Sequence, residues 1–490
     1  MKLDVEVIRI PIRGLRGRWL NFLSKQQIYD MHLAVLEVLE CVGVRVETDL
    51  MLKMFHEGGG YVDFKERIVR FPEYMVEEAI HKAPKRVVLM GRKPQYDVIL
   101  EDNRICFGLG GSPKSRILDL ESGILREPLK KDVEDGTRLG DALEKISFIQ
   151  NLAQAMDVPK KVQYDHVAQA MFNNTEKHLL ITAPSAEEAE RIIRMASVVE
   201  EAFGRKPISI YSGPASPLML TASQENIIVA AEKGLPIVLC NAPMAGATAP
   251  VTLAGAVVQN IAENLSALIL SQLVKPGIPV VLGSTSTVMD PRTGSFSLGA
   301  PELMLEQVMS AQMSHYYGLP YFGCGCCSDS KTFDVQAAVE AAMTGLTAAL
   351  GGLNMIQDVG VIDLDDAGCF ELAVLSEEII GIIERILRGF SVDDEALALD
   401  VIAEVGPGGH FLAHRHTLKF VEEEIYLPRL FDRRSEGDWF RGGAKDLRDV
   451  IRERAKKILK EHQPEPLPKH VQKKLDYLVK ETERKVLGAP

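Results

Sequence analysis

The sequence lacks the features that would tie a chain of this size to nucleic acid, to a membrane or to a disulfide framework. Its 56 Lys and Arg are outnumbered by 68 Asp and Glu, and the net charge of −12 argues against a nucleic-acid surface. No apolar run of about 18 residues is free of charge, so we expect no membrane span. The seven cysteines are an odd number, and Met1–Glu6 has no signal-peptide pattern. We therefore expect a reducing, cytoplasmic location.

What the chain does contain is a series of eight short apolar runs, each followed by a helical stretch. They start about 30 to 45 residues apart, which is the spacing of βα units. We expect strands at Ile105–Gly110, Phe148–Leu152, His178–Thr182, Ile208–Gly213, Ile237–Asn241, Val280–Ser284, Tyr321–Cys324 and Met355–Val359.

Eight such units predict an α/β fold of the TIM (β/α)8 barrel type. An open doubly wound sheet is the rival, but no Gly-x-Gly-x-x-Gly motif follows any of the runs. One barrel takes about 250 residues, so the chain needs additions at its ends. We expect an N-terminal helical, α+β extension at residues 1–100, a catalytic barrel at 101–400 and a C-terminal helical extension at 401–490.

The stretch Tyr321–Glu340 concentrates more potential chemistry than any other. It begins as an apolar strand, breaks into small residues at Gly323–Ser328 and continues as a helix. Ligands bind at such turns in parallel α/β proteins, because strand carboxyl ends and helix amino ends converge there. The turn holds Cys324, Cys326 and Cys327. Zinc ligation and a role as small, adaptable barrel-top residues are both open for these cysteines.

Two acids stand close to this turn or to the strand that follows. Asp329 lies at an expected helix amino end, where an N-cap explains it as well as chemistry does. Asp358 lies near the end of the eighth strand, where an acid faces the barrel mouth and suits a cationic ligand.

The remaining candidates are strand ends that we expect to face inward, and one histidine. His410 follows the Gly-rich turn Gly406–Gly409 and could reach the pocket; with His414 and His416 it resembles a metal cluster, but no His-Glu-x-x-His spacing is present. No Ser or Cys nucleophile has a recognisable His partner. Each strand-end residue is either pocket wall or barrel filler; they are Phe107, Gln154, Tyr211, Asn241, Ser284 and Phe322.

Four segments in this order resemble the trimethylamine:corrinoid methyltransferase superfamily. They are Leu36–Glu47, Ala249–Ala256, the turn and helix Gly323–Glu340, and Gly408–Leu412. The resemblance spans about residues 25 to 445. It implies a TIM barrel that transfers a methyl group from a methylated amine to the cobalt of a separate corrinoid protein.

The resemblance also carries a departure. Trimethylamine members of the superfamily have pyrrolysine in the seventh-strand turn, whereas Cys327 stands at that position here. The chain therefore resembles the branch without pyrrolysine, whose members act on glycine betaine and related quaternary amines. A tertiary amine is a poor methyl donor, because an amide anion would have to leave. A quaternary ammonium instead releases a neutral tertiary amine.

A site for a quaternary ammonium should surround the cation with aromatic faces, each contact contributing about 0.5–2 kcal/mol. Our candidates are Phe107, Tyr211, Phe296 and Phe322, and a betaine carboxylate would need donors such as His410 or Asn241.

The resemblance thus implies a methyltransferase in which Cys327, Asp329 and Asp358 are the catalytic candidates. Its partner is a cognate corrinoid protein that carries the cobalamin, so no corrinoid is expected to be bound tightly by this chain. We also expect a homo-oligomer. Two alternatives remain open: a barrel that binds methylated amines without turnover, and a zinc-dependent methyltransferase that uses Cys324, Cys326 or Cys327.

Overall fold

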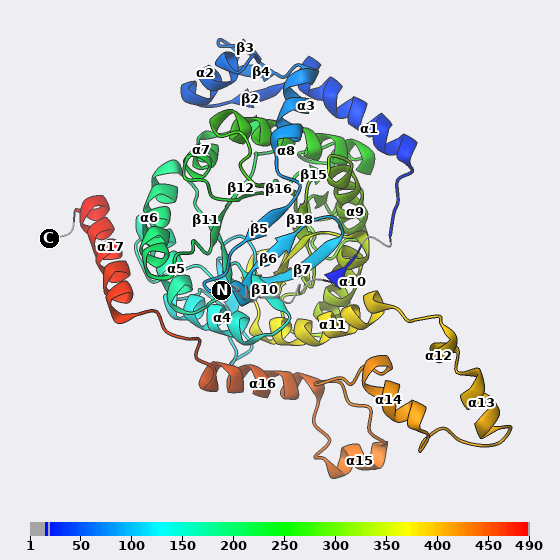
Figure 1. Ribbon diagram of the computed structural model, residues 1–490. Helices are drawn as coiled ribbons and strands as arrows, with labels where there is room; N and C mark the ends of the chain where they lie inside the picture. The colour runs from blue at the N-terminus through cyan, green and yellow to red at the C-terminus, as the bar shows by residue number, and fades with distance from the viewer. Residues whose placement is uncertain (1–14, 18–19, 489–490) are drawn as a thin grey trace, which may run out of the picture.

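The computed structural model describes residues 15–17 and 20–488, so Met1–Glu6 lies outside the described residues. Eight parallel strands form a ring in which each strand bonds to the next and the last, β19, returns to the first, β7, with Met355 opposite Cys106. All eight expected strands are present and the TIM-barrel prediction is confirmed (Figure 1). The ring consists of β7 (Arg104–Leu109), β10 (Ile146–Ile149), β11 (His178–Thr182), β12 (Ile208–Ser212), β14 (Ile237–Leu239), β16 (Val280–Gly283), β18 (Tyr321–Cys324) and β19 (Met355–Val359).

A ring of eight helices covers the barrel, one after each strand. Each buries an apolar face against the outward side chains of the strands, as the βα repeat requires. The helices are α4 (Lys130–Ala142), α5 (Gln163–Asn173), α6 (Ala186–Phe203), α7 (Glu225–Glu232), α8 (Leu253–Val274), α9 (Pro301–Tyr316), α10 (Val335–Gly351) and α11 (Phe370–Arg388).

Helix α8 is the one described helix that is long and apolar enough to cross a membrane by length and composition. Its most apolar window is 72% buried, because α8 packs between α7 and α9 and beneath the N-terminal extension. The sequence rule missed it because Glu263 interrupts the apolar run.

The barrel lumen has its own apolar core, separate from the layer between strands and helices. Side chains alternate in and out along each strand, so every second residue faces the lumen. Phe148, Leu180, Val238, Phe322 and Met355 meet there. A hairpin of β5 (Val87–Leu89) and β6 (Val98–Leu100) contributes Val and Leu side chains to this core and closes the amino-terminal end of the strands. The lumen core is therefore covered at the amino-terminal end of the strands, and ligands of TIM barrels bind at the opposite, carboxyl end.

The N-terminal extension packs on the outer face of α8. Figure 1 shows it as the blue unit beside α8. It combines helices with a small sheet that β13 (Met219–Leu220) of the barrel joins. Its elements are α1 (Lys25–Glu37), a π-turn (Val38–Val42), β2 (Val44–Val46), α2 (Asp49–Glu57), β3 (Tyr61–Asp63), β4 (Ile68–Arg70) and α3 (Glu73–Lys82).

The C-terminal part is helical, as predicted. Its last two helices return to the barrel: α16 (Leu447–Glu461) packs on α11 and α4, and α17 (Lys469–Leu487) packs on α5 and α6. The helices between them and α11 stand outside the helical ring (Figure 1). They are α12 (Asp394–Leu397), α13 (Leu399–Val405), α14 (Arg415–Glu424) and α15 (Glu436–Arg441).

Candidate active site

Polar atoms without partners gather where the strands of the barrel end. Both amide atoms of the Gln150 side chain, the hydroxyl of Thr182 and the side-chain amide oxygen of Gln357 are buried and lack a hydrogen-bond partner among the described residues. These residues stand two positions beyond Phe148, Leu180 and Met355, which face the lumen. The alternation therefore points them into the mouth as well. Unpaired buried polar groups cost about 1–3 kcal/mol each, so their gathering indicates a ligand site.

Asp358 is the acid of this mouth. It is 1% exposed, and in the described part of the chain its two carboxylate oxygens have no hydrogen-bond partner apart from the weak thiol donor of Cys324. Burial, together with the negative charge of Asp365, raises the pKa of Asp358 to about 7, although Lys114 opposes the shift. The ionised form of such a buried acid is stabilised when a cation binds beside it.

Lys114 is completely buried and forms an ion pair with Asp365. Burial by itself would lower the pKa of Lys114, but the charges of Asp365 and Asp358 outweigh it and raise the pKa. Lys114 is therefore cationic. With Asp365 engaged by Lys114, the remaining negative charge of this group falls on Asp358.

Two of the predicted aromatic residues face the lumen together. The rings of Tyr211 and Phe322 lie 6.0 Å apart, edge to face, and Phe322 belongs to the lumen core. The Tyr211 hydroxyl also interacts with the thiol of Cys240. Tyr211 is partly exposed and packs at the margin of the lumen core. This pair is the part of the predicted aromatic set that the fold directs into the pocket.

The seventh-strand turn separates its three cysteines. The Cys324 thiol lies 3.8 Å from the Gln357 amide in the lumen. The Cys326 thiol points the other way, toward Gly345 of α10 and Ser376 of α11. Across residues 15–17 and 20–488, no three His, Cys, Asp or Glu side chains form a group that could hold a metal ion. Within the described residues, the three cysteines therefore do not form a common zinc site.

Cys327 is fully buried, and its thiol is not an activated nucleophile. Burial, together with the Asp358 carboxylate, raises the pKa of Cys327 well above its ordinary value. The backbone is strained on both sides of the site, with φ of 57° at Cys326 and 68° at Asp358. Left-handed backbone at non-glycine residues clusters at functional sites.

Asp329 binds the long loop of residues 284–300 to the seventh-strand turn. Its carboxylate accepts bonds from the Ser297 hydroxyl, from the Leu298 N–H at 2.6 Å and from the Gly299 N–H at 3.0 Å. The N-cap of α10 is Asp334, not Asp329. Phe296 lies half-buried in the same loop, bridged to Met289, and packs against the outer core.

Three predicted wall residues face the helical layer instead of the lumen, and that part of the prediction is wrong. Phe107 belongs to the core between strands and helices, because Cys106 on the same strand takes the inward position. Asn241 binds Asn260, Glu263 and Asn264 of α8, and the Ser284 hydroxyl donates to the Asn241 carbonyl oxygen. A shift of one residue along a strand reverses the face.

Gln154 and His410 both lie in loops and not on the strands of the barrel. Gln154 is buried in the loop after β10, where its N–H donates to the Lys114 carbonyl oxygen at 3.0 Å. His410 is exposed in the loop between α13 and α14, outside the ring of helices. Within one chain the fold therefore does not bring His410 to the pocket.

Comparison with known proteins places this architecture in a family. The sequence profile of the trimethylamine methyltransferase (MTTB) family matches residues 7–486. The chain belongs to that family. It is 35% identical to the trimethylamine methyltransferase MttB of Desulfitobacterium hafniense over 97% of both chains. It is 34% identical to MttB2 of Methanosarcina mazei, over 96% of this chain and 97% of that one. It is 30% identical to the glycine betaine methyltransferase of D. hafniense, over 95% and 98%.

This MTTB-family methyltransferase also has pocket residues that the sequence patterns did not single out. Gln150, Thr182, Gln357 and Lys114 were missed, although three of them carry a readable signal. Each is a polar residue two positions beyond an inward apolar residue, at the end of a strand. Lys114 lies in a loop, and only the fold shows that it is buried.

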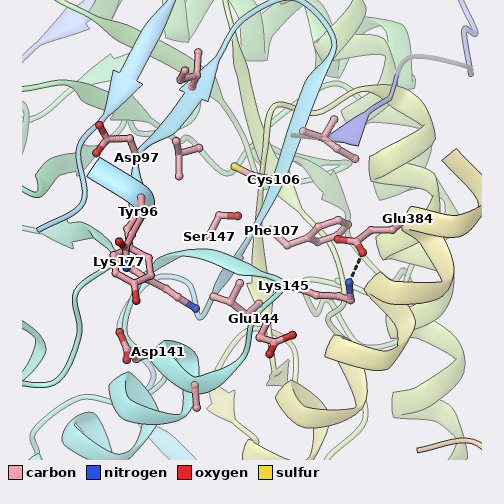
Figure 2. A pocket seen from close by; sticks show the side chains of 16 residues that line it. Tyr96, Asp97, Cys106, Phe107, Asp141, Glu144, Lys145, Ser147, Lys177 and Glu384 are labelled. Atoms are coloured by element: carbon pink, nitrogen blue, oxygen red, sulfur yellow. Dashed lines mark hydrogen bonds and ion pairs between the residues drawn. The ribbon is translucent and has the colours of Figure 1, made fainter. Parts of the chain in front are cut away.

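A cavity lies at the opposite, amino-terminal end of the methyltransferase barrel. It has a volume of about 280 Å³ and is lined by the start of β7 and β10 and by α4 (Figure 2). Its charged side chains have partners: Lys145 pairs with Glu384, and Asp141 accepts bonds from Thr175 and His462. Phe107 contributes to this outer cavity. The amino-terminal end of a TIM barrel serves stability, which favours the opposite mouth as the active site.

Proposed function

We propose that this methyltransferase takes a methyl group from a quaternary amine of the glycine betaine type and transfers it to the cobalt of a separate corrinoid protein. The observation that carries the proposal is the combination of a buried, unpartnered acid, Asp358, with the aromatic pair Tyr211 and Phe322 at one mouth. A permanent cation is the ligand that such a site accommodates best.

The pocket has two polar sides that suit a zwitterion. Asp358 and the side-chain amide oxygen of Gln357 are acceptors at the end of β19, and they face the positive end of the ligand. The Gln150 amide, directly after β10, and the Thr182 hydroxyl, at the end of the adjacent strand β11, are donors. They offer hydrogen bonds to a carboxylate. A betaine that spans the mouth would satisfy both groups, whereas trimethylamine has no carboxylate for the donors.

The lumen core beneath the mouth excludes water from the inner side of the bound amine. Phe148, Leu180 and Met355 fill the space directly under the polar layer. The bound amine is therefore held against an apolar floor, with its free side toward the opening. The corrinoid acceptor supplies the electron pair for the new bond to the methyl carbon, while the C–N pair leaves with a neutral tertiary amine. This chain needs no residue that becomes methylated.

Cys327 takes a supporting role in this proposal. Its thiol stays protonated because burial and Asp358 raise its pKa. The neutral, buried thiol adds no charge to the turn beside Asp358. Asp329 acts through the loop that it holds, and Asp358 is the group that contacts the substrate.

The test is methyl transfer with purified chain and cobalamin reduced to the cobalt(I) state. A panel of glycine betaine, tetramethylammonium and trimethylamine is added, and the cobalt spectrum and the released amine are followed together. We expect turnover with glycine betaine, none with trimethylamine and loss of turnover in Asp358→Ala. Tight betaine binding by calorimetry without turnover would instead support a binding barrel. Turnover of trimethylamine alone would contradict the proposed substrate class.

A further inference from the structure

The segment outside the helical ring, residues 390–445, exposes an unusual amount of apolar surface. We call it the arm; it contains α12 to α15. All of its residues are described, and only Val401 is buried. Six of its large apolar side chains are 71–82% exposed: Phe390, Val392, Leu399, Leu412, Leu418 and Leu427. Monomeric proteins rarely expose contiguous apolar patches above about 300–600 Å².

Polar contacts hold the arm in a defined place. Arg385 of α11 donates to the Glu424 carbonyl oxygen at 3.0 Å and pairs with the Glu424 carboxylate at 2.9 Å. The Tyr426 hydroxyl donates to Glu378 of α11 at 2.7 Å. Lys419 of α14 pairs with Glu395 of α12. The arm is thus fixed at its root, while its six most exposed apolar side chains remain 71–82% exposed.

A complementary apolar surface lies on the flank of the same barrel. Val335, Val339 and Met343 stand four residues apart on α10, so they share one face, and each is at least 51% exposed. Beside them an apolar groove of about 220 Å³ runs between α10 and α11. Phe431 of the arm and Leu447, the first residue of α16, already occupy one edge of this groove. The groove therefore continues an apolar contact that the arm's own root begins.

We propose that the arm of one copy docks on the α10 flank of a second copy, so that two chains exchange arms. Arm and flank are both present on every chain, which allows two equivalent contacts about a twofold axis. All large exposed apolar side chains of arm and flank together amount to on the order of 1,000 Å² per copy, if each presents roughly 100 Å² when fully exposed. A stable interface needs about 800 Å² from each partner.

The position of the arm favours a second copy over the corrinoid protein. The arm extends sideways from α11, beyond the ring of helices (Figure 1). The acceptor must approach the mouth, at the carboxyl ends of the strands. Helix α10 begins directly after the seventh-strand turn, so an arm docked on it lies beside the rim of the other copy's active site.

The first experiment measures mass by light scattering behind size exclusion, without substrate, so its outcome is independent of the proposed function. We expect twice the chain mass of 54.1 kDa for the wild type. The variants Leu412→Asp/Leu418→Asp, on the arm, and Val339→Asp/Met343→Asp, on the flank, should be monomers with unchanged circular dichroism. The matched control is Ile124→Asp, which replaces a side chain that is 69% exposed elsewhere, and it should stay a dimer. A monomeric wild type, or dimers in both variants, would overturn the proposal.

A second experiment tests which surfaces meet. In a Cys41→Ser background, which removes the one exposed thiol among the described cysteines, Leu418→Cys chains are mixed with Val339→Cys chains and treated with a bifunctional maleimide. Cross-linking in the mixture, and not in either variant alone, supports arm-on-flank docking. Cross-linking only among Leu418→Cys chains would assign the arms to each other and overturn it. Arm variants that keep their mass but lose transfer to a corrinoid protein would overturn it as well, and would assign the arm to the acceptor.

Discussion

Gly111 and Asp358 lie so close at the barrel mouth that any side chain at position 111 would overlap the Asp358 carboxylate. A Cβ built on Gly111 meets the Oδ1 of Asp358 and lies 3.2 Å from the Nζ of Lys114. Gly111 lies two residues after β7, and Asp358 is the next-to-last residue of β19. These two strands pair to close the barrel. The Asp358 carboxylate can therefore occupy its position only because residue 111 has no side chain.

Gly111→Ala should displace the Asp358 carboxylate and lower kcat/KM for methyl transfer by about 100-fold, because a misplacement of about 1 Å at a reacting centre has that effect. The thermal midpoint should fall only slightly, since the displaced group is already unpartnered. Gly437→Ala is the control: it lies in α15, where the nearest atom to an added Cβ is 3.5 Å away. Equal activity of Gly111→Ala and wild type would show that Asp358 is not part of the active site.

Substrate affinity should depend on pH through Asp358. The pKa of this acid is raised to about 7, and a permanent cation binds the ionised form. Affinity should therefore rise about tenfold between pH 6 and pH 8 and level off above. Asp358→Asn should weaken binding at pH 8 by about 10- to 100-fold and abolish the slope. The pKa of Glu306 is also raised to about 7, by burial, so Glu306→Gln is the control and should keep the slope. Calorimetric titration at several pH values measures both.

The same acid should reduce the stability of the free protein above neutral pH. Because its folded-state pKa is higher than the ordinary value of 3.8, the unfolded state releases the proton first as pH rises. Stability is thus lost between about pH 4 and pH 7. Asp358→Asn should have a free energy of unfolding higher by about 1–3 kcal/mol at pH 8 and unchanged at pH 4. Denaturant unfolding at the two pH values tests this, and a less stable variant at pH 8 would show that Asp358 is a structural ion-pair partner.

The strands could be predicted from the sequence because the barrel makes each a buried apolar run with its own helix. It was harder to predict from the sequence which side of the barrel wall each side chain faces. Phe107 and Phe322 are both strand aromatics, and only the register shows that Phe322 faces the lumen while Phe107 faces the helices. Gln150 and Gln357 passed unnoticed because a polar residue at a strand end is common in any loop. Their significance comes from burial without partners, which is a property of the fold.

The aromatic pair should distinguish a cation from a neutral group of the same shape. Tyr211→Leu should weaken binding of glycine betaine by about 2- to 30-fold, the equivalent of about 0.5–2 kcal/mol for one lost cation–π contact. Binding of 3,3-dimethylbutanoate, which has carbon in place of the ammonium nitrogen, should change little. Phe107→Leu is the matched control, since it removes an aromatic ring from the other side of the wall and should leave the preference for the cation intact. An equal loss for both ligands in Tyr211→Leu would mean that the ring acts through shape alone.

The order of the loop of residues 284–300 should depend on Asp329 more than the stability of α10 does. Asp329 accepts bonds from Ser297, Leu298 and Gly299, whereas Asp334 caps α10 through the Ala337 N–H. Asp329→Ala leaves two backbone donors unpaired, so residues 295–300 should exchange amide hydrogen faster and methyl transfer should slow by about 10-fold. Asp334→Ala removes a cap of about 1 kcal/mol, which should lower stability without freeing the loop. Hydrogen exchange with peptide resolution separates the two effects. If both variants lost activity in proportion to their stability alone, Asp329 would be a general structural residue, and the loop of residues 284–300 would have no separate role in covering the bound amine.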